Sequence, residues 1–134
     1  MAQKIRFANW APVLFFSAKT KKGITDVFGN AFEIFKERKK RIGTSELNQF
    51  LPEIFYNHVA PSVGTKMGKL KFVSQVAARP PKFVFHVNNK SAFHFTYKRY
   101  MENKIREKYG FHGTPIWIDI RDSMETFKGG KKRK

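Results

Sequence analysis

Positively charged side chains are the most abundant ionisable groups in this sequence. The chain has 27 lysines and arginines against 10 aspartates and glutamates, which gives a formal net charge of +17 at pH 7. Such an excess destabilises a compact chain by self-repulsion unless a polyanion neutralises it. Solubility or attraction to acidic lipids is the alternative, and the lack of a long basic amphipathic helix with a clean apolar face disfavours binding to lipids. The charge balance therefore predicts a nucleic-acid partner.

The candidate RNA-contacting residues lie in three basic segments, two on or after predicted helices and one in the C-terminal tail. Side chains in such positions can neutralise phosphates without reading the base sequence. For any single residue a solvated helix surface is the alternative, because Glu102 and Glu107 offset part of the charge. The candidates are Lys36, Arg38, Lys39, Lys40, Arg41, Lys98, Arg99, Lys104, Arg106, Lys108, Lys131, Lys132 and Arg133.

Two further features have both an RNA-binding and a structural interpretation. Gly110 and Gly113 form a G-x-x-G motif, the signature of RNA-clamping KH loops, but here the motif joins a helix to a strand instead of two helices. A helix C-cap and a turn glycine explain both positions, and we favour that interpretation. Tyr97, Tyr100 and Trp117 could stack on an unpaired base, although core positions explain most aromatic residues.

Catalytic and metal-binding groups are sparse. The chain has no cysteine, which excludes disulfides and thiolate zinc sites. Its four histidines, His58, His86, His94 and His112, lie on different predicted elements without an i,i+4 pair or a carboxylate cluster between them. We therefore expect neither a catalytic residue nor a metal site.

An incomplete strand-helix unit is predicted for residues 1–42. The apolar run at residues 12–16 does not alternate with polar residues, which is typical of a strand buried on both faces of a parallel sheet. Apolar residues from Ile24 to Phe35 then recur at helical spacing, and a basic run follows them. The other strands of such a sheet are missing. The strand is therefore expected to dock elsewhere, pair with another copy, or remain an exposed aggregation hazard.

A complete α+β domain is predicted for residues 43–121. Thr44 is expected to cap a helix that Pro52 kinks or splits, and a loop follows at residues 61–68. Ser91 is expected to cap a long helix that ends at Gly110. Two strands precede the long helix and one follows it, at residues 70–76, 83–87 and 116–121.

This order, α-β-β-α-β, predicts two layers, with the helices packed on one face of a three-stranded sheet. In the last strand Ile116, Ile118 and Ile120 should face the core, and Trp117, Asp119 and Arg121 should face solvent or a partner. Residues 122–134 form a basic tail with little to bury, for which we expect disorder.

Several motifs carry a resemblance to a known family. They are APVLFFSAK at residues 11–19, RIGTSELN at 41–48, RPP at 79–81, HFTYKRYMEN at 94–103 and GTPI at 113–116. With the order of elements, they resemble the C-terminal end of the Der (EngA) family of ribosome-biogenesis GTPases, from about residue 5 to residue 121. The resemblance implies that residues 1–42 are the last strand and helix of a second G domain. It implies that residues 43–121 are a KH-like domain.

The resemblance also implies what the parent protein binds. In the family, GTP and magnesium are bound by the G domains, and Ser17, Ala18 and Lys19 match the loop that contacts the guanine base. The chain lacks the G-x-x-x-x-G-K-[ST] phosphate loop and an Asn-Lys-x-Asp motif, so we expect no GTP binding or hydrolysis by these residues alone.

The partners implied by the resemblance are rRNA of the large ribosomal subunit and the G domains of the same protein. The alternative is a protein–protein regulatory domain with only unspecific RNA attraction. The N-terminus lacks the apolar core of a signal peptide and no run is long enough to span a bilayer, so we expect a cytoplasmic protein without a membrane partner.

Overall fold

The computed structural model describes residues 8–123 except residues 59 and 61. Most of the predicted basic tail, including Lys131, Lys132 and Arg133, lies outside the described residues. The elements in chain order are α1 (Ile24–Arg38), α2 (Thr44–Asn57), β1 (Ser62–Val63), β2 (Lys66–Met67), β3 (Leu70–Ala78), β4 (Pro81–Val87), the short 3₁₀ helix η1 (Lys90–Ala92), α3 (Phe95–Tyr109) and β5 (Trp117–Asp122).

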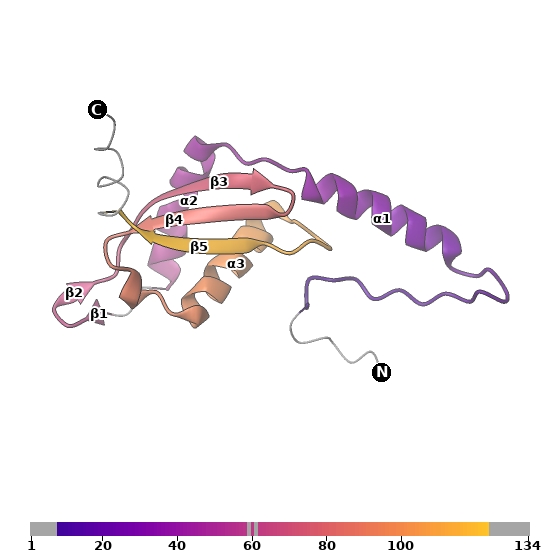
Figure 1. The fold of residues 1–134 in the computed structure, drawn as a ribbon, viewed down its shortest axis with the longest axis horizontal. Helices are drawn as coiled ribbons and strands as arrows, with labels where there is room; N and C mark the ends of the chain where they lie inside the picture. The colour runs from indigo at the N-terminus through magenta and orange to yellow at the C-terminus, as the bar shows by residue number, and fades with distance from the viewer. Residues whose placement is uncertain (1–7, 59, 61, 124–134) are drawn as a thin grey trace, which may run out of the picture.

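A three-stranded mixed sheet forms the centre of the domain. Its strand order is β3-β4-β5, with β3 antiparallel and β5 parallel to the central strand β4. Helices α2 and α3 cover one face of this sheet (Figure 1). The predicted α-β-β-α-β order and the two-layer α+β architecture are therefore confirmed for this part of the chain.

The hydrophobic core lies between the sheet and the two helices. Phe83 and Phe85 of β4, Met101 and Ile105 of α3, and Ile120 of β5 are completely buried there. Their spacing follows the period of two in strands and of three to four in helices, so each element turns its apolar face inward. The predicted alternation in the last strand is confirmed, since Ile116 and Ile120 are buried while Trp117 is exposed.

Some element ends differ from the sequence prediction. Helix α2 begins one residue after Gly43, whose carbonyl accepts a hydrogen bond from the Leu47 amide, so Thr44 is the first helical residue instead of the cap. Ser91 lies in η1 and His94 precedes α3. Pro52 does not split α2, because the buried residues around it hold the helix on the core. A short β1–β2 hairpin occupies the predicted loop at residues 61–68.

The predicted strand at residues 12–16 is not formed. The segment has no regular secondary structure and is exposed, with Phe15 81% exposed. A strand requires at least one neighbouring strand to pair with, and the structure shows only an extended segment that leads through a turn into α1 (Figure 1). The predicted helix that follows is confirmed as α1, although no residue of α1 is buried. Among the described residues, no helix has the length and hydropathy needed to cross a membrane.

Candidate nucleic-acid interface

Arg106 of α3 makes its hydrogen bonds within the protein. Its Nη1 donates hydrogen bonds to the carbonyl oxygens of Phe111 at 2.7 Å and Thr114 at 3.1 Å, and its Nη2 contacts Glu102 Oε1 at 3.0 Å. The side chain is only 16% exposed. Two of these contacts direct the guanidinium into the loop between α3 and β5 and the third binds Glu102 of α3, so few of its donors remain for an outside partner.

Two lysines of α3 are paired with carboxylates. Lys104 Nζ lies 3.0 Å from Glu107, and Lys108 Nζ lies 3.6 Å from Glu53. Exposed pairs of this kind contribute little stability, but they neutralise charge locally.

Lys98 and Arg99 differ from these residues, because neither makes an ion pair with any residue that the structure describes. Arg99 lies near the aromatic ring of Phe95, with 6.0 Å between its guanidinium carbon and the ring centroid. The N-terminal half of α3 therefore has the uncompensated positive charge of this helix.

The basic run at the end of α1 also contains both residues that form ion pairs and residues that do not. Lys36 pairs with Glu33 at 3.0 Å and Lys40 pairs with Glu37 at 2.7 Å. The unpaired members within the described chain are the exposed residues Arg38, Lys39 and Arg41. The structure thus places two groups of uncompensated charge, one on α3 and one at and just after the C-terminal end of α1.

The loop between α3 and β5 contains the G-x-x-G motif and is held by α1. Glu37 Oε2 accepts a hydrogen bond from the Phe111 amide at 2.7 Å, and Lys40 Nζ donates to the Tyr109 carbonyl at 2.9 Å. Burial raises the pKa of the Glu37 carboxyl, but the hydrogen bonds from Lys40 and the loop amides and the charge of Lys40 outweigh it. The pKa therefore lies below its usual value. A charged Glu37 thus attaches α1 to the loop at neutral pH.

Both glycines of the motif have the structural roles favoured from the sequence. Gly110 is the C-cap of α3 at φ 89°, and Gly113 has φ 70°. The Gly113 amide donates to the carbonyl of Trp10 at 3.1 Å. An RNA clamp of the KH type needs free loop amides between two helices, whereas these amides are bound within the chain.

Gly113→Ala is expected to detach α1 from the domain. A Cβ at this position would lie 2.3 Å from Ile34 Cγ1, and the left-handed conformation adds strain. Phe111, two residues before Gly113, belongs to the hydrophobic core, so amide exchange of the central strand β4 should be followed as well, to separate loss of α1 docking from loss of core packing. We expect amide exchange across α1 to accelerate at least about tenfold, since the helix then opens independently of the core.

Gly29→Ala is the matched control, because nothing lies within 4 Å of a Cβ placed there. This substitution in an exposed helix should stabilise α1 by up to about 1 kcal/mol. Unchanged exchange in Gly113→Ala would show that the contact with Ile34 does not hold α1.

Of the aromatic residues considered for base stacking, only Trp117 is exposed. The Tyr97 hydroxyl donates to the carbonyl of His58 at 2.7 Å and the Tyr100 hydroxyl to that of Ile54 at 2.7 Å. Burial raises the pKa of Tyr97 to about 12, so its hydroxyl remains a donor at neutral pH. Phe95, which the sequence interpretation missed, is 73% exposed beside Trp117 in a shared groove. Phe95 lies four residues before Arg99, and this spacing indicates that the two side chains share one face of the helix.

Ser17, Ala18 and Lys19 lie in the turn between the extended segment and α1, at the end farthest from the sheet (Figure 1). Ser17 Oγ accepts a hydrogen bond from the Thr20 amide at 3.2 Å, while Ala18 and Lys19 are exposed. Such an exposed turn surrounds no ligand by itself. The sequence also has no G-x-x-x-x-G-K-[ST] loop that would hold the phosphates.

No group of three or more histidine, aspartate or glutamate side chains within the described ranges is placed to hold a metal ion. His58 contacts the rings of Tyr97 and Tyr100, with centroids 5.5 and 4.9 Å away, and His86 contacts Phe72 at 5.8 Å. These histidines therefore lie in aromatic clusters.

Comparison with known proteins matches the part of the chain that contains α2, the three-stranded sheet and α3. The sequence model described as KH-domain-like of EngA bacterial GTPase enzymes, C-terminal, matches residues 41–121. GTPase Der of Thermomicrobium roseum is 44% identical over 120 residues, which are 90% of this chain and 26% of that protein. GTPase Der of Chloroflexus aggregans is 40% identical over 122 residues, 89% of this chain and 27% of that protein. The chain thus spans about a quarter of the length of these relatives.

Proposed function

Because the chain belongs to the Der (EngA) GTPase family, as its C-terminal KH-domain-like region, we propose that it attaches such a GTPase to rRNA. The rRNA is that of the large ribosomal subunit during its biogenesis in the cytoplasm. In this proposal the domain is a binding module, and GTP hydrolysis with magnesium belongs to the G domains of the parent protein.

The uncompensated charge of Lys98 and Arg99 is the observation that supports RNA binding most strongly. Both lie on the N-terminal half of α3, whereas the other basic residues of this helix are paired or directed inward. Positive charge without an internal partner attracts phosphates and releases their counterions. These two residues therefore form the centre of the proposed footprint, and Arg38, Lys39 and Arg41 form a second contact near the end of α1.

The footprint should read the shape and charge of RNA more than its sequence. Lysine and arginine contacts to phosphates position a protein on RNA but carry no base information. The G-x-x-G loop does not add a clamp, since the Phe111 and Gly113 amides are already bound. Orientation on the ribosome then depends on where the charged groups lie relative to one another.

We further propose that residues 1–42 are the end of a second G domain. Apolar side chains of the extended segment and of α1 are exposed, among them Phe15 and Phe28 at 81% and 72%. The other strands of a G domain would cover them, and Ser17, Ala18 and Lys19 would then reach the guanine base. Residues 43–121 form the KH-like domain in this arrangement, and residues 122–134 add basic charge.

A protein–protein role is the second candidate, and the link between α1 and the α3–β5 loop favours it. Glu37, Lys40 and Ile34 fix α1 against this loop. Through this link a movement of a G domain would reach the KH-like domain directly. In that case the domain regulates its own G domains, and the RNA attraction is unspecific.

Removal of charge from α3 separates these two candidates. A Lys98→Ala/Arg99→Ala double variant should bind an rRNA fragment of the large subunit about 5- to 30-fold more weakly at moderate salt, since two phosphate contacts are lost. Fluorescence anisotropy of a labelled fragment measures this change.

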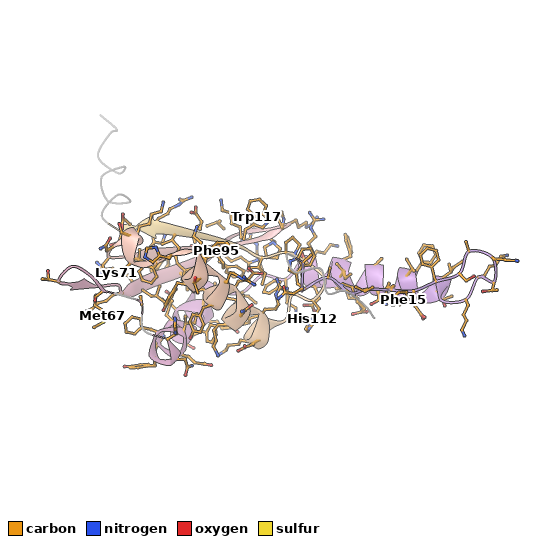
Figure 2. The ribbon with its side chains drawn as sticks, turned by 90° about the horizontal axis from the view of Figure 1, so that it is seen from below. Phe15, Met67, Lys71, Phe95, His112 and Trp117 are labelled. Carbon is orange, nitrogen blue, oxygen red and sulfur yellow. The ribbon has the colours of Figure 1, made fainter. Side chains whose placement is uncertain are left out.

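The matched control is Lys69→Ala/Lys71→Ala, which removes the same charge from exposed lysines near the start of β3. Figure 2 shows the position of Lys71. We expect it to weaken binding less than about threefold. Equal losses in the two double variants would mean that only the net charge matters, which would contradict the footprint and favour the regulatory candidate.

A further inference from the structure

A groove of about 560 Å³ lies between the N-terminal half of α3 and the start of β5. Phe95 and Arg99 line it from α3, Trp117 lines it from β5, and Trp10 lines it from the segment before α1. Figure 2 shows Phe95 and Trp117 at the same side of the domain. Both tryptophans of the chain thus face one groove, which we call the aromatic groove.

Exposed rings are the unusual feature of the aromatic groove. Phe95 is 73% exposed and Trp117 is 59% exposed. Single exposed aromatic residues are common, but two beside one groove indicate a binding surface. Their flat faces suit a ligand that is itself flat and aromatic, because stacked rings gain more than their buried area alone.

Polar groups accompany the rings on the same face of α3. Phe95, Arg99 and Asn103 are spaced by four residues, so they lie above one another along the helix. Arg99 has the positive charge that a phosphate needs, and the Asn103 amide offers both a donor and an acceptor for the edge of a base.

The one carboxylate of the aromatic groove is neutralised. Glu102 also lines the groove and would repel a phosphate, but its Oε1 lies 3.0 Å from Arg106 Nη2. The uncompensated charge in the groove is therefore the positive charge of Arg99.

We propose that the aromatic groove binds an unpaired base of single-stranded RNA. The base stacks on Trp117 and Phe95, Arg99 contacts the neighbouring phosphate, and Asn103 contacts the base edge. This site deepens the proposed function and rests on it, but it adds a base-dependent contact to a footprint that otherwise recognises only phosphates.

The test compares two single-stranded oligoribonucleotides of about eight nucleotides, one intact and one in which every base is removed. Both have the same phosphates, so the electrostatic footprint should bind them alike. The intact oligonucleotide should bind at least about fivefold more tightly and quench tryptophan fluorescence, because it alone can stack. Trp117→Ala should remove this preference, and Phe95→Ala should reduce it.

Tyr56→Ala is the control, since Tyr56 is 82% exposed on α2 and does not line the groove. It should keep the full preference. Trp117 is largely exposed, so we expect its variant to retain the far-ultraviolet circular dichroism of the wild type.

Each outcome decides between the two proposals. Equal, salt-dependent binding of both oligonucleotides would overturn the base site and leave the phosphate footprint intact. A preference for bases that persists in both Trp117→Ala and Phe95→Ala would also overturn it, because the base then binds elsewhere. Binding of neither oligonucleotide, together with unaltered rRNA-fragment binding by Lys98→Ala/Arg99→Ala, would overturn both.

Discussion

Arg106→Ala should lower the free energy of unfolding by about 2–3 kcal/mol, the largest stability effect that we expect from any basic residue of this chain. The substitution leaves the carbonyls of Phe111 and Thr114 and the carboxylate of Glu102 without their shared partner. Partly buried acceptors without donors cost more than the hydrogen bonds contribute when they are made. Urea unfolding followed by circular dichroism measures the change.

Arg99→Ala is the matched control on the same helix. Arg99 is exposed and makes no ion pair with the described residues, so its loss should change the free energy of unfolding by less than about 0.5 kcal/mol. Arg106→Lys should recover only part of the loss, since an ammonium lacks the planar fork that reaches several acceptors together. Wild-type stability of Arg106→Ala would show that the loop does not depend on this guanidinium.

The architecture could be predicted because its elements are periodic in sequence. The apolar residues of α3 recur at three and four positions, and Ile116, Ile118 and Ile120 alternate with polar neighbours. Such patterns fix which face of an element is buried. They do not fix the ends of elements, where a backbone cap at Gly43 replaced the expected Thr44 side chain.

The strand at residues 12–16 shows what such patterns cannot supply. An apolar run has the composition of a buried strand wherever it occurs, but a strand forms only when other strands accept its backbone hydrogen bonds. None of the strands in the described structure pairs with this segment. The prediction was therefore wrong for this chain, whereas the helix after it forms with its own internal hydrogen bonds.

The candidate site was predictable only as a set of charges. Arg99 and Arg106 are seven residues apart, which places them on nearly the same face of α3. The sequence pattern does not distinguish the two residues. In the structure the loop from Phe111 to Thr114 binds Arg106, whereas Arg99 is exposed. That distinction depends on tertiary structure. Phe95 and Trp10 were missed for the same reason, because only the fold brings them beside Trp117.

The salt dependence of binding tests the central claim, that this chain attaches a GTPase to rRNA through phosphate contacts, most directly. If about two to four phosphates are neutralised, the affinity for a large-subunit rRNA fragment should fall roughly 12- to 150-fold over a fourfold rise in salt. The slope of log affinity against log salt should become less steep by about two units in Lys98→Ala/Arg99→Ala. An affinity that barely changes with salt, or a slope unaltered in this variant, would contradict the account.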